Sequence, residues 1–366
     1  MVICDMMWAG ITLLALYLGG NIYLFARLWQ LVATQPLWLR VAMALLFIIA
    51  ALSLFASFAL RNAEVNPTIT QSLFRIGSAW LVFLLYATIL LIIADVTRLI
   101  FPSLQHGTLY ALGVTTLLLI YGYINYQNPH IEHIEVTTTK PMQAERYRIV
   151  MASDIHLGYG TTRNDLARYV ELINKQKGDV LVIVGDLIDN SLKPVIEENM
   201  CEEFQHIEAP DGIFLAPGNH EYISNMSAVE EYLSKSNIRL LRDSVAPLAN
   251  INIIGRDDRS NHHRAELENL LAKCDTTHPT ILLDHQPYSI AESAQHGIDI
   301  HLSGHTHRGQ IWPLSWLTDA IYEQSHGYRI WEECHTIVSS GLSLWGPPFR
   351  IGTQSELWVI DIKHAE

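Results

Sequence analysis

Long apolar runs alternate with short polar breaks in the first third of the chain. Four runs approach the roughly 20 predominantly apolar residues that a helix needs to cross a bilayer: residues 6–26, 41–60, 76–94 and 107–126. Pro36, Pro67 and Pro102 fall in the breaks, where helices end. Tryptophan and tyrosine gather near the ends of the runs, as they do at membrane interfaces. The pattern predicts a four-helix transmembrane region over residues 1–128.

Two other interpretations of these runs are less favoured. Four buried helices of a soluble domain would carry more polar positions along their exposed faces. A cleaved signal peptide would begin with basic residues, and neither Lys nor Arg precedes residue 27. We therefore expect a multi-pass protein of the plasma or inner cell membrane.

The sidedness of the chain depends on its arginines. An even number of spans places the N-terminus and the region after the spans on the same side. The first and third loops hold Arg27, Arg40 and Arg98, whereas the second loop holds Arg61 and Arg75. Because basic residues prefer cytoplasmic loops, this difference of one arginine favours a non-cytoplasmic C-terminal region.

After residue 128 the pattern changes to short alternating elements. Residues 129–146 contain Asn, Thr and Pro and predict a linker. Beyond it, β-branched runs at 148–152 and 180–184 flank a helical pattern at 164–176, and a run at 213–216 follows a helical pattern near 194–206. Strand-like runs dominate afterwards, at 251–254, 280–283, 298–302, 336–338 and 357–362. These elements predict an α/β domain over residues 147–366, with βαβ units first and a mixed sheet later.

Charge divides the chain at the same place. Residues 1–128 contain five Arg, no Lys and three acidic residues, a balance of +2. The whole chain has a net charge of −13, so residues 129–366 carry −15. An acidic surface repels polyanions, and binding to nucleic acid needs Lys and Arg, so we expect no nucleic-acid partner. The four cysteines show no paired spacing, which argues against a disulfide framework.

Five short blocks in the second region carry the chemistry of the chain. They are Asp154-Ile155-His156, Gly185-Asp186-Leu187-Ile188-Asp189, Gly218-Asn219-His220-Glu221, Asp284-His285 and Gly304-His305-Thr306-His307. Their carboxylate, imidazole and amide groups suit two metal ions and leave one spare histidine. Two metal ions form a clamp for in-line displacement at phosphorus.

The position of the blocks supports this interpretation. Each block comes just after an expected strand, and α/β sheets bind ligands at the carboxyl ends of their strands. Glycine in three blocks is expected to allow tight turns. In an extended segment, Asp154 and His156 would face one way, and His305 and His307 would do the same. A chance cluster of structural histidines would rarely reproduce this ordered set.

Together the blocks resemble the signature of the calcineurin-like metallophosphoesterase family, which reads D-x-H, G-D-x-x-D, G-N-H-[DE], H and G-H-x-H. The resemblance covers about residues 147–362 and implies an αββα sandwich. Residues 304–310 are similar to a branch with membrane-anchored and exported bacterial phosphoesterases, although that branch usually has Gly where Arg308 stands. The later Pro348-Phe349-Arg350 and Glu356 are also similar to this branch.

The resemblance implies roles for particular residues. One metal would be bound by Asp154, His156, Asp186 and His307. The other would be bound by Asp186, Asn219, His285 and His305, so that Asp186 bridges the pair. His220 would act as general acid, oriented by Asp189. Arg308 either contacts a substrate phosphate or is a solvated arginine, and Glu221 would form local hydrogen bonds.

We therefore expect a membrane-anchored phosphoesterase that needs two divalent ions, with Mn, Fe and Zn all compatible with the ligand types. Its substrate would be a phosphate ester or a pyrophosphate, and membrane residence suggests a lipid-linked or cell-envelope substrate. The alternative is a non-catalytic membrane scaffold or sensor on the same fold. That alternative is disfavoured because every ligand position and His220 are present.

Overall fold

The computed structural model describes residues 2–60, 63, 65–103, 106–248 and 250–365. These residues divide into two units. One comprises Met1–Tyr123 with Gly346–Pro348, and the other comprises Ile124–Trp345 with Phe349–Glu366. Arg61, which enters the sidedness argument, lies outside the described residues.

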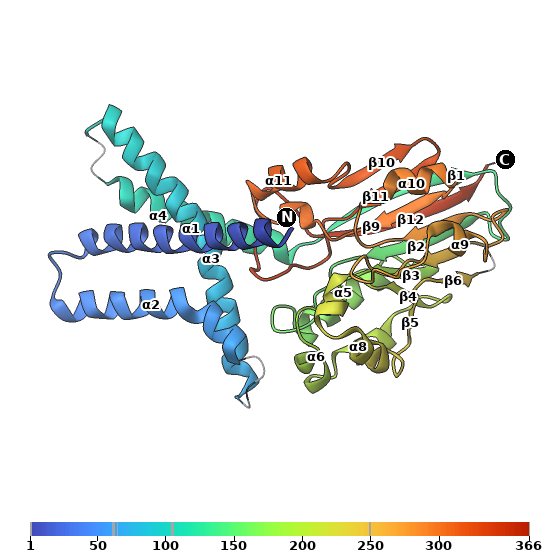
Figure 1. The fold of residues 1–366 in the computed structure, drawn as a ribbon, viewed down its shortest axis with the longest axis horizontal. Helices are drawn as coiled ribbons and strands as arrows, with labels where there is room; N and C mark the ends of the chain where they lie inside the picture. Colours follow the sequence, from blue (N-terminus) through green and yellow to red (C-terminus); the bar gives the residue numbers. More distant parts are fainter. Residues whose placement is uncertain (1, 61–62, 64, 104–105, 249, 366) are drawn as a thin grey trace. The chain divides into compact units, whose positions relative to one another are not determined.

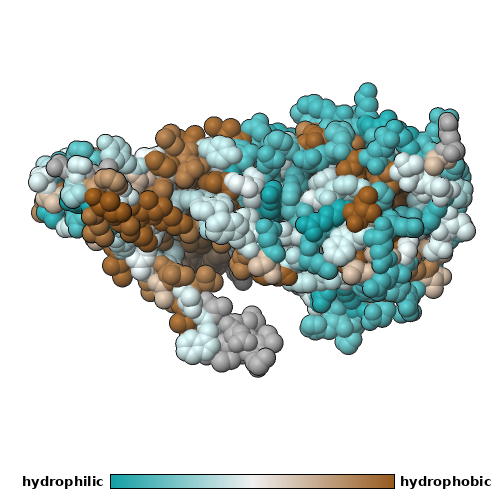
Figure 2. Space-filling model, turned by 90° about the horizontal axis from the view of Figure 1, so that it is seen from above, coloured by the Kyte–Doolittle hydropathy of each residue, from teal (hydrophilic) through white to brown (hydrophobic). Residues whose placement is uncertain are grey.

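Four long helices make up most of the first unit (Figure 1). They are α1 (Val2–Leu31), α2 (Leu37–Leu60), α3 (Pro67–Ile100) and α4 (Gly107–Gln127), whose last turn belongs to the second unit. Each is long and apolar enough to cross a membrane, which confirms the four candidate spans. Their outward side chains are strongly exposed, as at Leu13 (67%) and Leu46 (68%), and Figure 2 shows this apolar surface in brown. Such a surface is expected to face lipid.

Polar groups of α1 and α3 pair with one another at two places. Arg27 of α1 forms an ion pair with Asp95 of α3, and Tyr23 donates a hydrogen bond to the same carboxylate. Trp80 Nε1 donates to Asn21 Oδ1 at 3.0 Å. In a bilayer an unpaired polar group is costly, so these contacts stabilise the association of α1 with α3.

The second unit contains two six-stranded sheets. The first has the order β1 (His130–Thr138), β12 (Glu356–His364), β2 (Arg146–Ala152), β3 (Val180–Val184), β4 (Ile213–Ala216), β5 (Ile238–Leu240). The second has the order β10 (Gly327–Trp331), β11 (Cys334–Val338), β9 (Ile300–Ser303), β8 (Thr280–Leu283), β7 (Asn252–Gly255), β6 (Ser244–Pro247). Strands β2 to β5 run parallel, as do β11, β9, β8 and β7. Their carboxyl ends therefore collect at one edge of each sheet.

The two sheets pack face to face and helices cover their outer faces, as the αββα prediction requires. Ile149 and Val182 of the first sheet share a buried core with Ile281 and Leu302 of the second. On the outer face of the first sheet lie α5 (Arg163–Asn174), α6 (Lys193–Glu197), the 3₁₀ helix η1 (Met200–His206) and α8 (Met226–Leu233). The second sheet is covered by α9 (Leu267–Leu271) and α10 (Ile290–Gln295). Apolar residues on alternate strand positions thus fill both sides of each sheet.

The short strands β5, β6 and β10 were not predicted from the sequence, and two predicted segments have a different structure. Residues 130–138, expected within a linker at 129–146, form β1 and pair in parallel with β12. This strand has no clear alternation of apolar and polar residues, because it contains several His and Glu residues and only Val136 is buried. The helical pattern near 194–206 is divided into α6 and η1, because Asn199 has a left-handed backbone with φ of 48°.

Candidate metal centre

Both sheets contribute to one cluster of polar side chains. The blocks that begin at Asp154, Gly185 and Gly218 follow β2, β3 and β4 of the first sheet. Those that begin at Asp284 and Gly304 follow β8 and β9 of the second. Loops far apart in the sequence therefore meet at the carboxyl edges of the sandwich, as predicted.

The first group of potential ligands is Asp154, His156 and His307, all buried. The Nε2 atoms of His156 and His307 are 3.0 Å apart, and His307 Nε2 is 3.4 Å from Asp154 Oδ1. Burial, together with the neighbouring His156, lowers the pKa of His307 well below its ordinary value, so its ring is neutral. A neutral imidazole and a carboxylate at these distances can share one metal ion.

The second group is Asp186, His285 and His305. His285 Nε2 lies 3.1 Å from Asp186 Oδ2, while its Nδ1 lies 2.8 Å from the carbonyl oxygen of Val184. That carbonyl can accept only from a protonated Nδ1, so in the neutral ring the lone pair of Nε2 is directed at the cluster. Burial, reinforced by His285, lowers the pKa of His305 to about 4, so this ring is neutral as well.

Asp186 connects the two groups. Its Oδ2 is 3.1 Å from His285 Nε2 in the second group and 3.8 Å from His156 Nε2 in the first. Its Oδ1 accepts a hydrogen bond of 2.9 Å from the backbone N–H of His220. The carboxylate is thus oriented by the backbone with one oxygen between the two sets of ligands.

The donor set fits two divalent ions. Within the described part of the chain, the buried Asn219 Oδ1 and His285 Nε2 have no hydrogen-bond partner. Buried polar atoms are rarely left in this state, and metal coordination would satisfy both. Carboxylate, amide and imidazole ligands suit Mn, Fe and Zn.

His220 stands beside the ligands, in α7 (Asn219–Ile223). Its Nδ1 is 3.3 Å from Asp189 Oδ1, an atom that also lies 3.4 Å from His156 Nδ1. Burial lowers the pKa of His220, but the Asp189 and Asp186 carboxylates outweigh burial and raise it above its ordinary value. Burial likewise raises the pKa of Asp189, but its contacts with His156 and His220 outweigh burial and bring it to about 2. Asp189 is therefore ionised and can hold a proton on His220.

Glu221 fixes the two loops that carry Asp186 and Asn219. Its carboxylate accepts hydrogen bonds from the backbone N–H groups of Gly218 (2.7 Å), Asp186 (3.0 Å) and Ile188 (2.9 Å). The expectation of local hydrogen bonding is confirmed. Gly218 itself is needed for space, since a Cβ there would lie 2.2 Å from Asp186 Oδ1.

The expected extended conformation of the ligand loops is wrong. Asp154 and His156 have φ of 54° and 50°, and His305 and His307 have φ of 70° and 48°. Asp186 also has a left-handed backbone, with φ of 52°. The side chains converge because these loops bend sharply after the strands, and such strained backbone is typical of functional sites.

Three further side chains lie near the cluster of potential ligands. Arg308 is half-buried with φ of 51°, and its guanidinium makes no hydrogen bond or ion pair to any described residue. The ring centroids of Tyr322 and His305 are 6.1 Å apart, and those of Trp345 and His220 are 6.4 Å apart. No motif surrounds either aromatic residue, so the sequence did not indicate them.

Other polar residues lie outside the centre. His301 is buried in β9 between the hydroxyls of Ser293 (2.7 Å) and Ser303 (2.8 Å). Asp284 forms ion pairs with Arg256 and Arg264 instead.

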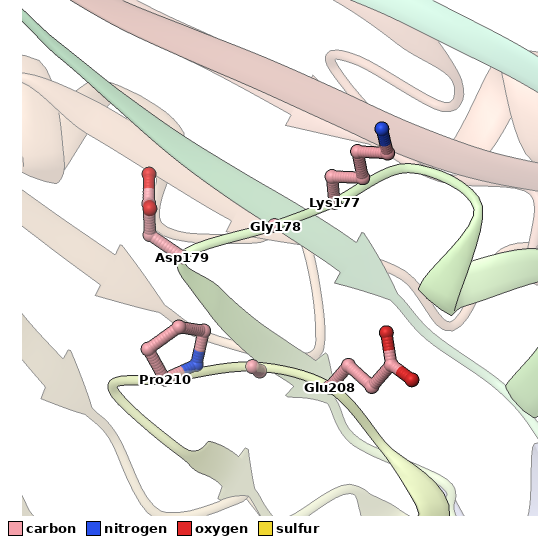
Figure 3. Close-up of a pocket in the computed structure, with 6 residues that line it drawn as sticks. Lys177, Gly178, Asp179, Glu208 and Pro210 are labelled. Atoms are coloured by element: carbon pink, nitrogen blue, oxygen red, sulfur yellow. The ribbon is translucent and has the colours of Figure 1, made fainter.

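A hollow of about 480 Å³ lies at the opposite, amino ends of β3 and β4. It is lined by Lys177, Gly178, Asp179, Glu208, Ala209 and Pro210 (Figure 3). Because it is at the far edge of the sheet, it takes no part in the metal centre.

Comparisons with known proteins agree with this geometry. A family model described as calcineurin-like phosphoesterase matches residues 147–309. The chain is 33% identical to a metallophosphoesterase of Campylobacter jejuni over 261 residues, covering 69% of each chain. It is 30% identical to one of Helicobacter pylori over 269 residues, covering 70% of this chain and 71% of the relative. A Danio rerio protein, described as a transmembrane protein with metallophosphoesterase domain, is 34% identical over 277 residues, covering 70% of this chain and 63% of that protein.

This chain belongs to the calcineurin-like phosphoesterase family. The relationship and the fold confirm the resemblance seen in the sequence motifs. The protein joins a metallophosphoesterase domain to four helices that can span a membrane.

Proposed function

We propose that this protein is a membrane-anchored phosphoesterase that hydrolyses phosphate ester or pyrophosphate bonds with two divalent metal ions. The observation that carries the proposal is the position of Asp186, whose Oδ2 lies between His285 and His156 and so between two sets of potential ligands. When bound, two such ions polarise the phosphate and activate water for in-line attack at phosphorus.

In this proposal each ligand except Asp186 would bind one ion. Asp154, His156 and His307 hold one ion, with Asp186 shared. The other ion is held by His285 and His305, also with Asp186, and by the amide oxygen of Asn219, which is buried without a hydrogen bond among the described residues.

His220 supplies the proton that the departing oxygen needs. Its Nδ1 lies 3.3 Å from Asp189 Oδ1, and the neighbouring carboxylates raise its pKa, which favours the protonated ring. A protonated imidazole beside the substrate phosphate would act as general acid. Asp189 is a positioning residue, because its carboxylate contacts His220 and His156.

The proposed substrate carries its phosphate on a lipid or on another cell-envelope molecule, because the spans keep the enzyme in the membrane. The acidic balance of residues 129–366 disfavours nucleic acid. The arginine balance favours a non-cytoplasmic catalytic domain in the plasma or inner membrane.

The test uses purified full-length protein with a phosphate monoester, a phosphodiester and a lipid pyrophosphate, with Mn²⁺ added and then chelated. Bound metal is measured on the same samples. We expect metal-dependent turnover that falls at least a hundredfold in His220→Ala and in Asp186→Asn. His262→Ala, at an exposed loop histidine, is the matched control and should keep its activity. Two bound metals without turnover of any ester would favour the scaffold alternative.

A further inference from the structure

Helix α11 (Leu314–Ile321) carries its apolar side chains outward. None of its eight residues is buried. Leu314, Trp316, Leu317 and Ile321, here called the α11 face, lie on one side of the helix and are 43–65% exposed. On the opposite side Asp319 accepts a hydrogen bond from Ser325, so the polar side is the one bound to the domain. An amphipathic helix that covers a soluble core has the reverse orientation.

The α11 face adjoins the metal centre. The helix packs against the 3₁₀ helix η2 (His307–Gly309), which contains a proposed ligand. At its other end comes Tyr322, whose ring lies 6.1 Å from that of His305, another proposed ligand. A surface that binds the α11 face would therefore lie next to the phosphate site.

The α11 face also lies near the place where the fourth span ends. In the last turn of α4, Asn125 Nδ2 donates to the carbonyl of Thr353 at 2.8 Å. The hydroxyl of Thr353 donates to the carbonyl of Gln310, and Trp312 N donates to the carbonyl of Ile351 at 2.7 Å. The loop at 350–353 thus connects the end of a membrane span to the residues that lead into α11. Because the fourth span continues directly into this turn, a bilayer surface is the binding partner that we infer for the α11 face.

We propose that the α11 face enters the headgroup region of the bilayer and presents the metal centre to phosphate groups carried on lipids. Trp and Leu on one side of a short helix are typical of interfacial helices. Arg308, between His307 and α11, has a guanidinium without a partner among the described residues, and an anionic headgroup complements it. The substrate part of this proposal rests on the proposed phosphoesterase function, whereas the membrane contact does not.

Membrane contact is tested with a spin label in full-length protein reconstituted in phosphatidylcholine–phosphatidylglycerol vesicles. The label is placed at Leu317→Cys, with Cys4 and Cys274 replaced by Ser. The matched control is Ile196→Cys on α6, which is also apolar and 52% exposed but lies on the outer face of the first sheet. We expect the label at 317 to be accessible to oxygen and shielded from a water-soluble nickel chelate. The label at 196 should be accessible to the chelate and less accessible to oxygen. Equal exposure of both positions to the chelate would overturn the proposal.

Lipid presentation is tested by comparing turnover of lipid and soluble esters of the same class. Phosphatidic acid is compared with para-nitrophenyl phosphate, and phosphatidylglycerol with bis(para-nitrophenyl) phosphate. In Trp316→Ser/Leu317→Ser the ratio of lipid to soluble turnover should fall at least tenfold, whereas in Ile196→Ser it should not change. An unchanged ratio in the double variant would refute lipid presentation. If wild type hydrolyses neither class of ester nor the lipid pyrophosphate, the proposed function fails, and the label measurement still decides the membrane contact.

Discussion

The guanidinium of Arg350 donates a 2.9 Å hydrogen bond to the backbone carbonyl of His307. Arg350 is fully buried and also donates to the carbonyls of Ser340, Gly341 and Ser343. One side chain far along the chain thus fixes the loop that carries a proposed metal ligand. This contact gives a physical role to an arginine that the sequence marked only through its family resemblance.

Replacing Arg350 by Lys should disorder the His307 loop. A lysine has no planar fork and cannot reach all four carbonyls, and each buried carbonyl left unpaired costs about 1–3 kcal/mol. We expect a lower unfolding temperature, a loss of bound metal towards one ion per chain and at least a tenfold drop in turnover. Thermal unfolding and metal analysis of the purified protein measure these changes. Arg329→Lys, at an exposed arginine of β10, is the control, and equal metal content in both variants would contradict the role of Arg350.

Replacing Glu221 by Gln should destabilise the loops that follow β3 and β4. Both carboxylate oxygens accept backbone N–H groups, so one of them would be replaced by an NH₂ group that faces a donor. A loss of about 1–3 kcal/mol of stability is expected, together with weaker metal binding. Thermal unfolding of the variant beside Glu231→Gln, at an exposed glutamate of α8, checks this prediction. Equal unfolding temperatures would show that Glu221 is dispensable.

Asp189→Asn should lower kcat about 10- to 100-fold while two metals remain bound. The Asp189 carboxylate helps to raise the pKa of His220, so its loss lowers that pKa. Because the proposed acid must be protonated, the alkaline limb of the kcat profile should move to lower pH. Asp275→Asn, at an exposed aspartate, should leave the profile in place. A reduced kcat with an unmoved limb would indicate a purely structural role for Asp189.

Metal binding should stabilise the folded protein. An ion that binds only the folded state at a thousandfold excess over its Kd contributes about 4 kcal/mol, or roughly 8–16 °C for a domain of this size. We expect the unfolding temperature to rise by this order when Mn²⁺ is added and to fall on chelation. In Asp186→Asn the response should be largely lost. A variant that responds like wild type would exclude Asp186 as a shared ligand.

Stability should also depend on His301. Burial lowers the pKa of His301 to about 3, whereas an unfolded histidine titrates near 6.5. The neutral ring therefore contributes stability above pH 6.5 that is lost as the pH falls from 6.5 towards 3, at up to about 1.4 kcal/mol per pH unit.

Between pH 7 and pH 5 the wild type should lose about 2 kcal/mol more than His301→Gln, a difference of about 4–8 °C in unfolding temperature. The site histidines titrate in both proteins and cancel in the comparison. His262→Gln, at an exposed histidine, should behave like wild type. Parallel pH dependence in wild type and His301→Gln would disprove the lowered pKa of His301 in the folded protein.

The sequence by itself determined the elements whose signal is local. Apolar runs placed the four helices, and the uninterrupted apolar runs at Val180–Val184 and Ile213–Ala216 became strands with the expected bounds. The five blocks identified the potential ligands because each follows a strand. β1 escaped prediction, since its alternating His and Glu residues form a strand only through pairing with β12 at the other end of the domain.

Tertiary structure alone decided how the ligands meet. The left-handed backbone of Asp154, His156 and Asp186 depends on neighbouring loops that hold it in place, and residue order does not reveal it. Arg350 reaches the His307 carbonyl, and α11 turns its apolar side outward, only because distant segments are packed together. Local patterns reflect short-range preferences for helix, strand and turn, whereas a site of this kind depends on long-range contacts that no local pattern contains.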